Sequence, residues 1–315
     1  MRIGLEDTLF RHGEALFAEL GEVVPLRETD VDACVVRAVN KVDKGFLLER
    51  PQLRYLASAT SGEDHLDRAA LDAATIETFV ARGCNAEAVA DWVVLACEQL
   101  SVRPEKLGIV GAGHVGKAVE GRFDCQVMLC DPPRAIAEPS FVSASIEEVF
   151  RECDVVTLHV PLNATTVDMV GHELLALLGQ GVLLNAARGE VLQTEAAVGF
   201  AENGGRLVLD VFRNEPSPDR ALLKATAFAT PHIAGHTFQA KNAGIEMCAR
   251  WLGAQNGKPS TRGGAYRSDG RSPREVLSET STALRRGADF KTLRAGAVRV
   301  ALSRAGQGER PEHPA

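Results

Sequence analysis

The chain of 315 residues is 45% hydrophobic and 24% charged, which is typical of a soluble globular protein with two domains of ordinary size. No apolar run approaches the roughly 20 residues that a membrane-spanning helix needs. The net charge is −7, but residues 256–315 carry 12 Lys and Arg against 6 Asp and Glu, or +6, so the rest of the chain carries −13. This acidic body argues against nucleic acid as the main partner. A basic tail can bind an acidic partner, but we favour a solvated tail.

The seven cysteines show neither a CxxC pair nor the spacing of metal ligands. We therefore expect reduced cysteines and no metal site. The N-terminal sequence MRIGLED is typical of a strand rather than of a charged leader followed by an apolar stretch, so we expect no secretory signal. These features indicate a cytoplasmic enzyme or binding protein without a membrane partner.

The first third of the chain alternates between short strand-like runs and helical or polar stretches. The runs RIGLE, ACVVRAV and LRYLASAT predict strands in a small α/β region. Asn85 is a predicted N-cap for the helix that follows, and Pro104 closes this element. Apolar residues at helical spacing support that helix: Val89, Trp92, Val93, Ala96 and Leu100.

From Leu107 to about residue 230, near-continuous apolar runs alternate with helical stretches. The runs are LGIV, QVMLCD, DVVTLHVP, GVLLNAA and RLVLDVF. Such runs are what a parallel sheet with both faces covered requires, so we predict a doubly wound dinucleotide-binding fold. Ser145 and Glu148 have the spacing of a capping box. A further helix is predicted over residues 237–252, and another within residues 275–303.

A glycine-rich turn lies directly between the first of these strands and a helix. The sequence GIVGAGHVG supplies Gly111, Gly113 and Gly116, with His114 and Val115 between the last two. Glycines at this spacing permit a tight turn, close approach of the backbone to a pyrophosphate, and close helix–strand packing. The helix N-terminus adds free N–H groups and a positive dipole. The turn predicts a dinucleotide site.

An acidic residue, Asp131, ends the next strand, 15 residues after Gly116. A carboxylate at this point accepts hydrogen bonds from the adenosine ribose and repels a 2′-phosphate, which favours NAD over NADP. Arg134 nearby leaves NADP possible, and Asp131 could instead be a surface-turn residue before Pro132 and Pro133.

Three short sequences in order supply the side chains that oxidation of a 2-hydroxy acid needs: NAARGEV, DVFRNEP and PHIAG. Arg188 can hold a carboxylate with two parallel hydrogen bonds. His232 can accept the hydroxyl proton near neutral pH, and Glu215 can orient and stabilise its imidazole. Each residue alone could be structural, but together and in this order they predict a catalytic set.

With these sequences the chain resembles the D-2-hydroxyacid dehydrogenase superfamily, and within it the erythronate-4-phosphate dehydrogenases of the pyridoxal phosphate pathway. The resemblance covers about residues 1–252. The matching segments are VRAVNKV, ATSGEDHLD, GCNAEAV, LCDPPR, NAARGEV, VLDVFRNEP and HIAGHT. It implies NAD-dependent oxidation of 4-phospho-D-erythronate at C2 to 2-oxo-3-hydroxy-4-phosphobutanoate.

The resemblance also implies site residues and a domain division. It makes Arg188, Glu215 and His232 catalytic, and it places NAD contacts at Asp131, Ala186, Ala187, Arg188, Asp210 and Gly235. Asp210 could instead cap a loop. The substrate-binding residues implied are Thr60, Ser61, Gly62, Ala38 and His236. Residues 1–84 and 236–254 would form a smaller, discontinuous substrate domain, residues 85–235 the NAD-binding domain, and residues 255–315 a poorly patterned, flexible tail.

Three positions depart from the family pattern. Ala38 stands in place of a serine, His236 in place of a tyrosine, and Val160 in place of a threonine. Arg37, Lys41 and His236 are candidate phosphate ligands. The family also appends a C-terminal dimerisation domain, so we expect a homodimer, although the segment here is short. Two alternatives therefore stay open, which are a different D-2-hydroxy acid as substrate and a non-catalytic NAD-sensing module.

Overall fold

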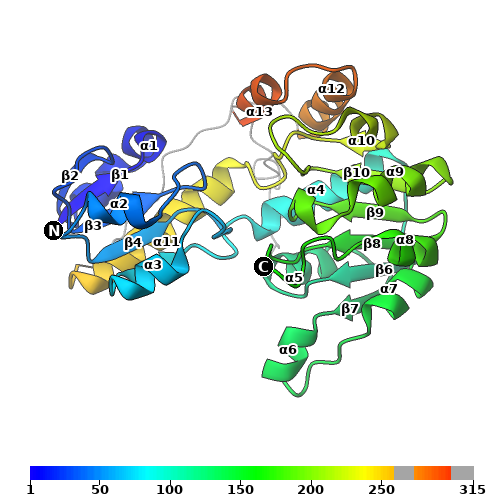
Figure 1. Ribbon diagram of the computed structural model, residues 1–315, viewed down its shortest axis with the longest axis horizontal. Coiled ribbons are helices and arrows are strands. Elements are labelled where there is room, and N and C mark those ends of the chain that lie inside the picture. The colour runs from blue at the N-terminus through cyan, green and yellow to red at the C-terminus, as the bar shows by residue number, and fades with distance from the viewer. Residues whose placement is uncertain (259–272, 299–315) are drawn as a thin grey trace, which may run out of the picture.

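The computed structural model describes residues 1–258 and 273–298, which form two parallel β-sheets with helices on both faces (Figure 1). The predicted fold class, a doubly wound parallel sheet with a smaller α/β region, is confirmed. Among the described residues, no helix has the length and apolar character to cross a membrane.

The first sheet is built from the N-terminal segment. Its strand order is β2-β1-β3-β4-β5, all parallel. The strands are β1 (Arg2–Leu5), β2 (Glu22–Pro25), β3 (Ala33–Val36), β4 (Tyr55–Ser58) and β5 (Glu77–Val80). The helices are α1 (Asp7–Ala18), α2 (Lys44–Leu48), α3 (Arg68–Ala73) and, from far along the chain, α11 (Phe238–Gln255). The three predicted strand runs are found as β1, β3 and β4.

Helix α11 returns to the first sheet after the chain has completed the second one (Figure 1). It packs against α1 and β4, and its Ile245 and Leu252 are fully buried in one cluster with Leu5 and Phe17. Burying apolar side chains of this size stabilises such a contact by about 1.5–3 kcal/mol each. This packing joins residues 1–84 to the segment after His236.

The second sheet has the order β11-β10-β9-β8-β6-β7. Its strands are β6 (Lys106–Val110), β7 (Gln126–Cys130), β8 (Val155–Leu158), β9 (Val182–Asn185), β10 (Arg206–Leu209) and β11 (Phe228–Ala229). The helices are α4 (Ala86–Gln99), α5 (His114–Glu120), α6 (Pro132–Ala137), α7 (Ile146–Glu152), α8 (His172–Leu178), α9 (Thr194–Glu202) and α10 (Arg220–Ala225), with a 3-10 turn at Gly189–Val191. The strand order reverses between β6 and β8, which is where open α/β sheets bind their ligands.

Two predicted helix caps have different outcomes. The capping box before α7 is confirmed, because the Ser145 hydroxyl accepts from the Glu148 N–H at 3.2 Å and the Glu148 carboxylate accepts from the Ser145 N–H at 2.8 Å. Asn85 stands at the N-cap of α4, but its side chain makes no capping hydrogen bond. It faces Gly235 instead, where an added Cβ would lie 2.6 Å from Asn85 Nδ2. The side chain therefore packs against the loop after β11 and does not cap its own helix.

Part of the segment expected to be a flexible tail is folded, which corrects that expectation. Helices α12 (Pro273–Arg285) and α13 (Phe290–Val298) pack beside the second sheet, with α12 against β11 and α10. Leu277, Leu284 and Phe290 are buried, and the Ser281 hydroxyl accepts from the Ala229 N–H at the edge of the sheet. This packing was not predicted, because only a few apolar residues on one helix face make the contact. The sequence around them is strongly polar.

Substitution Leu284→Ala tests this packing. Leu284 is 1% exposed, so its truncation leaves a cavity and is expected to lower the free energy of unfolding by about 2–5 kcal/mol in denaturant titrations. Leu48→Ala is the control because that leucine is 81% exposed, and it is expected to have little effect. Equal stability of the two variants would mean that α12 contributes nothing to the fold.

Candidate active site

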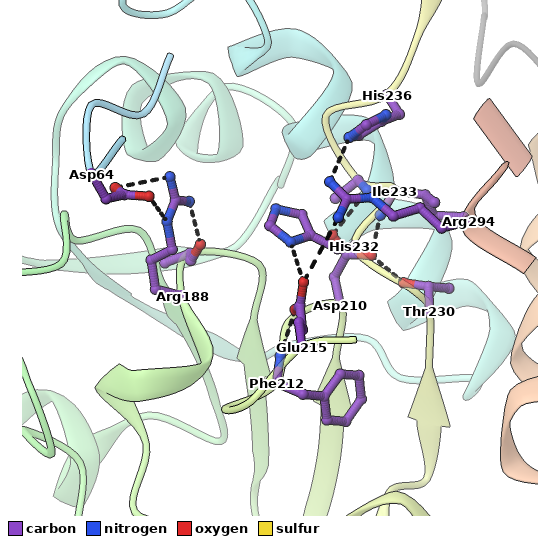
Figure 2. Close-up of polar contacts among 12 residues, drawn as sticks. Asp64, Arg188, Asp210, Phe212, Glu215, Thr230, His232, Ile233, His236 and Arg294 are labelled. Atoms are coloured by element: carbon purple, nitrogen blue, oxygen red, sulfur yellow. Dashed lines mark hydrogen bonds and ion pairs between the residues drawn. The ribbon is translucent and has the colours of Figure 1, made fainter. Parts of the chain in front are cut away.

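The three predicted catalytic residues stand on loops that follow neighbouring strands of the second sheet (Figure 2). Arg188 follows β9, Glu215 follows β10 and His232 follows β11. Because the strands are parallel, these loops emerge at the same edge of the sheet. Residues that lie 44 positions apart in the chain, Arg188 and His232, are brought to one site in this way.

His232 and Glu215 form a direct pair. The imidazole Nδ1 lies 2.7 Å from Glu215 Oε2, and the other carboxylate oxygen accepts from the Phe212 N–H at 2.9 Å. Because Nδ1–H donates to the carboxylate, Nε2 is the nitrogen that can accept a proton. His232 has a φ of 56°, a left-handed conformation that is costly for a residue with a Cβ. The loop therefore fixes the position of this imidazole while the backbone of His232 stays in a strained conformation.

A buried carboxylate, Asp210, braces that loop. Asp210 is 1% exposed, and its oxygens accept from the Ile233 N–H at 2.7 Å, the Ala234 N–H at 2.9 Å and the Thr230 hydroxyl at 2.5 Å. Trp92 Nε1 in turn donates to the Thr230 hydroxyl at 3.0 Å. Burial raises the pKa of Asp210 above its ordinary value. The structure thus assigns it the loop-capping role, and its contact with the cofactor stays a prediction.

Arg188 already holds a carboxylate, although that carboxylate belongs to the protein. Its Nε and Nη2 donate to the two oxygens of Asp64 at 3.0 and 3.2 Å, and Nη1 donates to the Ala187 carbonyl at 2.7 Å. This is the two-bond geometry expected for a substrate carboxylate. Asp64 lies inside the ATSGEDHLD segment, but no feature of the sequence marked it as a partner of Arg188.

The turn after β4 lies against Arg188. An added Cβ at Gly62 would be 2.0 Å from Arg188 Nη2, so only glycine lets the guanidinium approach this closely. The Thr60 hydroxyl lies 3.1 Å from the Ser58 hydroxyl, and the Ser61 hydroxyl accepts from the Gly83 N–H at 3.1 Å. The structure therefore brings the predicted substrate turn to Arg188, while the catalytic role of this arginine and the contact of the turn with substrate stay predictions.

Two of the three departures from the family pattern, Ala38 and His236, differ in their surroundings. Ala38 is exposed on the loop after β3. His236 is partly buried, with its ring centre 6.3 Å from that of His232, and its Nε2 lies 3.3 Å from Arg294 Nη2 on α13. Burial lowers the pKa of His236 well below its ordinary value, and nearby cations lower it further. Lys41, a candidate phosphate ligand, is exposed and pairs with Asp43.

The glycine loop has the geometry that a dinucleotide needs. Gly111 has a φ of 95°, and a Cβ there would lie 2.5 Å from the His159 carbonyl oxygen; a Cβ on Gly116 would lie 2.1 Å from the Gly111 carbonyl oxygen. At Gly113, by contrast, a Cβ would meet nothing within 4 Å, so the space beside this glycine is open. It lies where the first N–H groups of α5, from His114 and Val115, have no partners within the helix. These residues fit a bound pyrophosphate.

Asp131 is tied to the same loop. One of its oxygens accepts from the Ala112 N–H at 2.8 Å, and the other accepts from the Arg134 N–H at 3.0 Å. Arg134 also donates to the Ala112 carbonyl at 3.1 Å. The carboxylate therefore stands beside the glycine loop, as a ribose contact requires, and its contact with ribose stays a prediction. No group of side chains able to hold a metal ion occurs within the described part of the chain.

Comparisons with known proteins agree with this geometry. Residues 69–234 match the family described as "D-isomer specific 2-hydroxyacid dehydrogenase, NAD binding domain". Among solved structures, a glyoxylate reductase from Paecilomyes thermophila superposes with a TM-score of 0.70 at 21% identity, covering 83% of this chain and 97% of that one. The NAD-bound 3-phosphoglycerate dehydrogenase of Entamoeba histolytica superposes with a TM-score of 0.65 at 22% identity, covering 83% and 99%. The chain belongs to the D-isomer specific 2-hydroxyacid dehydrogenase family, and NAD is its cofactor.

Several curated relatives with substantial sequence similarity belong to one branch of this family. An erythronate-4-phosphate dehydrogenase of Aeromonas hydrophila is 36% identical over 273 residues, covering 78% of this chain and 72% of the relative. The enzyme of the same name from Yersinia enterocolitica is 36% identical over 277 residues, covering 79% and 74%. The predicted resemblance to erythronate-4-phosphate dehydrogenases is confirmed.

Proposed function

We propose that the protein catalyses NAD-dependent oxidation of 4-phospho-D-erythronate at C2, giving 2-oxo-3-hydroxy-4-phosphobutanoate. The observation that carries this proposal is the His232–Glu215 pair, with Arg188 on the neighbouring loop, in a chain 36% identical to enzymes named for this substrate. A non-catalytic NAD-sensing module has no need of such a proton acceptor.

Each residue of the set has a distinct part in the reaction. His232 Nε2 accepts the proton of the C2 hydroxyl, and the negative charge of Glu215 stabilises the imidazolium that results. Arg188 holds the C1 carboxylate and polarises the C2 oxygen as it becomes a carbonyl. The glycine loop, with Gly111, Gly113 and Gly116, would hold NAD, which would supply the acceptor for the hydride from C2. Arg188 can bind the substrate with Nε and Nη2 only when the Asp64 carboxylate no longer accepts from these two donors.

NADH formation from the purified full chain and NAD tests this function. The substrates are 4-phospho-D-erythronate, D-erythronate, D-glycerate and D-lactate. We expect turnover with a strong preference for the phosphorylated acid. Turnover restricted to unphosphorylated acids would instead favour the alternative that the substrate is a different D-2-hydroxy acid. The departures from the family pattern at Ala38 and His236 motivate this alternative. Absence of turnover on all four acids, with NAD still bound, would favour the sensing module.

The expected homodimer and the expected cytoplasmic location belong to the same proposal. The family resemblance supports both, and light scattering on the purified chain tests the first. A monomer at micromolar concentration would show that the short C-terminal segment does not provide the dimerisation expected of the family.

A further inference from the structure

Helix α13 is fixed against the loop that carries Glu215. Phe290, at the start of the helix, is 3% exposed and meets the ring of Phe212 edge-on at 6.2 Å between centroids. The Phe212 N–H is also the donor to Glu215 Oε1. The C-terminal helix therefore packs on the loop that shapes the catalytic pair, and side chains on α13 are held near that pair.

One of these side chains, Arg294, reaches the site itself (Figure 2). Its Nη2 lies 3.3 Å from His236 Nε2, and its Nη1 lies 4.0 Å from Glu215 Oε2. The Arg294 side chain is 34% exposed, so its guanidinium keeps access to solvent. Because Nε2 of His236 faces a donor, Nδ1 carries the proton, and this buried Nδ1 has no hydrogen-bond partner among the described residues.

The surroundings of His236 are rich in positive charge. Arg294, Lys241 and Arg37 each lower the pKa of His236, and burial together with Arg37 lowers the pKa of Lys241 to about 8. Two carboxylates lie near Arg37 and Arg294, and both also bind other groups. Glu6, 3.8 Å from Arg37, caps α1 through the Thr8 and Leu9 N–H groups, and Glu215 binds His232. An additional anion would be favoured electrostatically at this place.

In the view of Figure 2, Arg294 and His236 lie on the other side of His232 from Arg188. A substrate with its carboxylate on Arg188 and its C2 hydroxyl at His232 would extend its remaining carbons toward Arg294. Guanidinium groups bind phosphate with two parallel hydrogen bonds, which Lys does not reproduce.

We propose, building on the proposed function, that Arg294, oriented by its contact with His236, binds the terminal phosphate of the substrate and so determines specificity for the phosphorylated acid. Lys241 and Arg37 contribute positive charge around this subsite. The segment expected to be a tail would then complete the active site, and the histidine at position 236 would act together with the arginine of α13.

Calorimetric titration of the full chain with bound NADH, which does not oxidise a hydroxy acid, tests the subsite separately from turnover. We expect wild type to bind 4-phospho-D-erythronate more tightly than D-erythronate. Arg294→Ala is expected to weaken binding of the phosphorylated acid by about 10- to 100-fold and to leave D-erythronate nearly unchanged. Arg294→Lys is expected to recover part of the loss. Lys291→Ala is the matched control, since it removes an exposed positive charge from the same helix.

Two results would overturn the subsite. One is equal binding of the two acids by wild type, and the other is an equal loss for both acids in Arg294→Ala, which indicates a structural role. Thermal unfolding and NADH affinity of each variant confirm that the fold is intact, and His236→Ala provides a second variant with the same expected selectivity. Phosphate-dependent binding without any NADH formation would contradict the proposed function while supporting the subsite.

Discussion

Replacement of His232 by asparagine is expected to lower kcat for hydroxy-acid oxidation by about 10²- to 10⁴-fold, with little change in NAD affinity. Asparagine removes the proton acceptor but tolerates the left-handed backbone, with a φ of 56°, that the loop imposes on this residue. Alanine would combine the loss of the base with backbone strain. The measurement is steady-state NADH formation together with NAD binding by calorimetry.

His172→Asn is the matched control for this substitution. His172 is exposed at the start of α8, a helix that carries none of the predicted site residues, so its replacement is expected to leave kcat unchanged. Turnover by His232→Asn comparable to that of wild type would assign proton transfer to another group. The ring of His236 lies 6.3 Å from that of His232, centre to centre. Burial and neighbouring cations lower the pKa of His236, which makes it a poor proton acceptor at neutral pH.

Replacement of Arg188 is expected to have a comparably large effect, but mainly on substrate binding. Arg188→Ala removes two charge-assisted hydrogen bonds to the substrate carboxylate, each worth about 1.5–3 kcal/mol, so kcat/KM is expected to fall by about 10²- to 10⁴-fold. Arg188→Lys keeps the charge but not the two-bond geometry, so it is expected to recover only part of this loss. Kinetics over a wide range of substrate concentration separate the effects on KM and kcat.

Asp64 makes the arginine result easier to interpret. Arg188 is bound by Asp64 from the first sheet, so Arg188→Ala also removes a contact between the two sheets. Asp64→Ala removes the same contact but leaves the guanidinium, so a loss specific to Arg188→Ala reports carboxylate binding. Arg220→Ala, on exposed α10, controls for the loss of one positive charge. Equal losses in the Asp64 and Arg188 variants would indicate that Arg188 mainly joins the two sheets.

Local patterns in the sequence were sufficient for much of the fold and of the site. The glycine turn after LGIV predicted the dinucleotide loop because glycine spacing there is dictated by close backbone contacts, which the structure shows at Gly111 and Gly116. Arg188, Glu215 and His232 were predicted to be catalytic because the short sequences NAARGEV, DVFRNEP and PHIAG follow the glycine turn in that order. The pair of His232 with Glu215 follows from adjacent parallel strands, whose loops must meet.

The capping role of Asn85 could not be decided from sequence, because the same side chain can bind its own helix or a distant loop. Its environment beside Gly235 is set by the packing of α4 against the loop after β11. Asp210 is a similar case. The sequence placed it at a strand end with two possible roles, and only the positions of the Ile233 and Ala234 N–H groups showed that it braces the catalytic loop.

The sequence by itself thus determined the class of fold and the glycine loop, and it predicted the catalytic set, because all three depend on short segments with fixed spacing. The tertiary structure decided which distant groups meet that set. Asp64 reaches Arg188 across the two sheets, and Arg294 reaches His236 from a helix that follows a polar stretch. No local periodicity encodes contacts between positions 64 and 188 or 236 and 294, because they arise only when separately folded segments pack together.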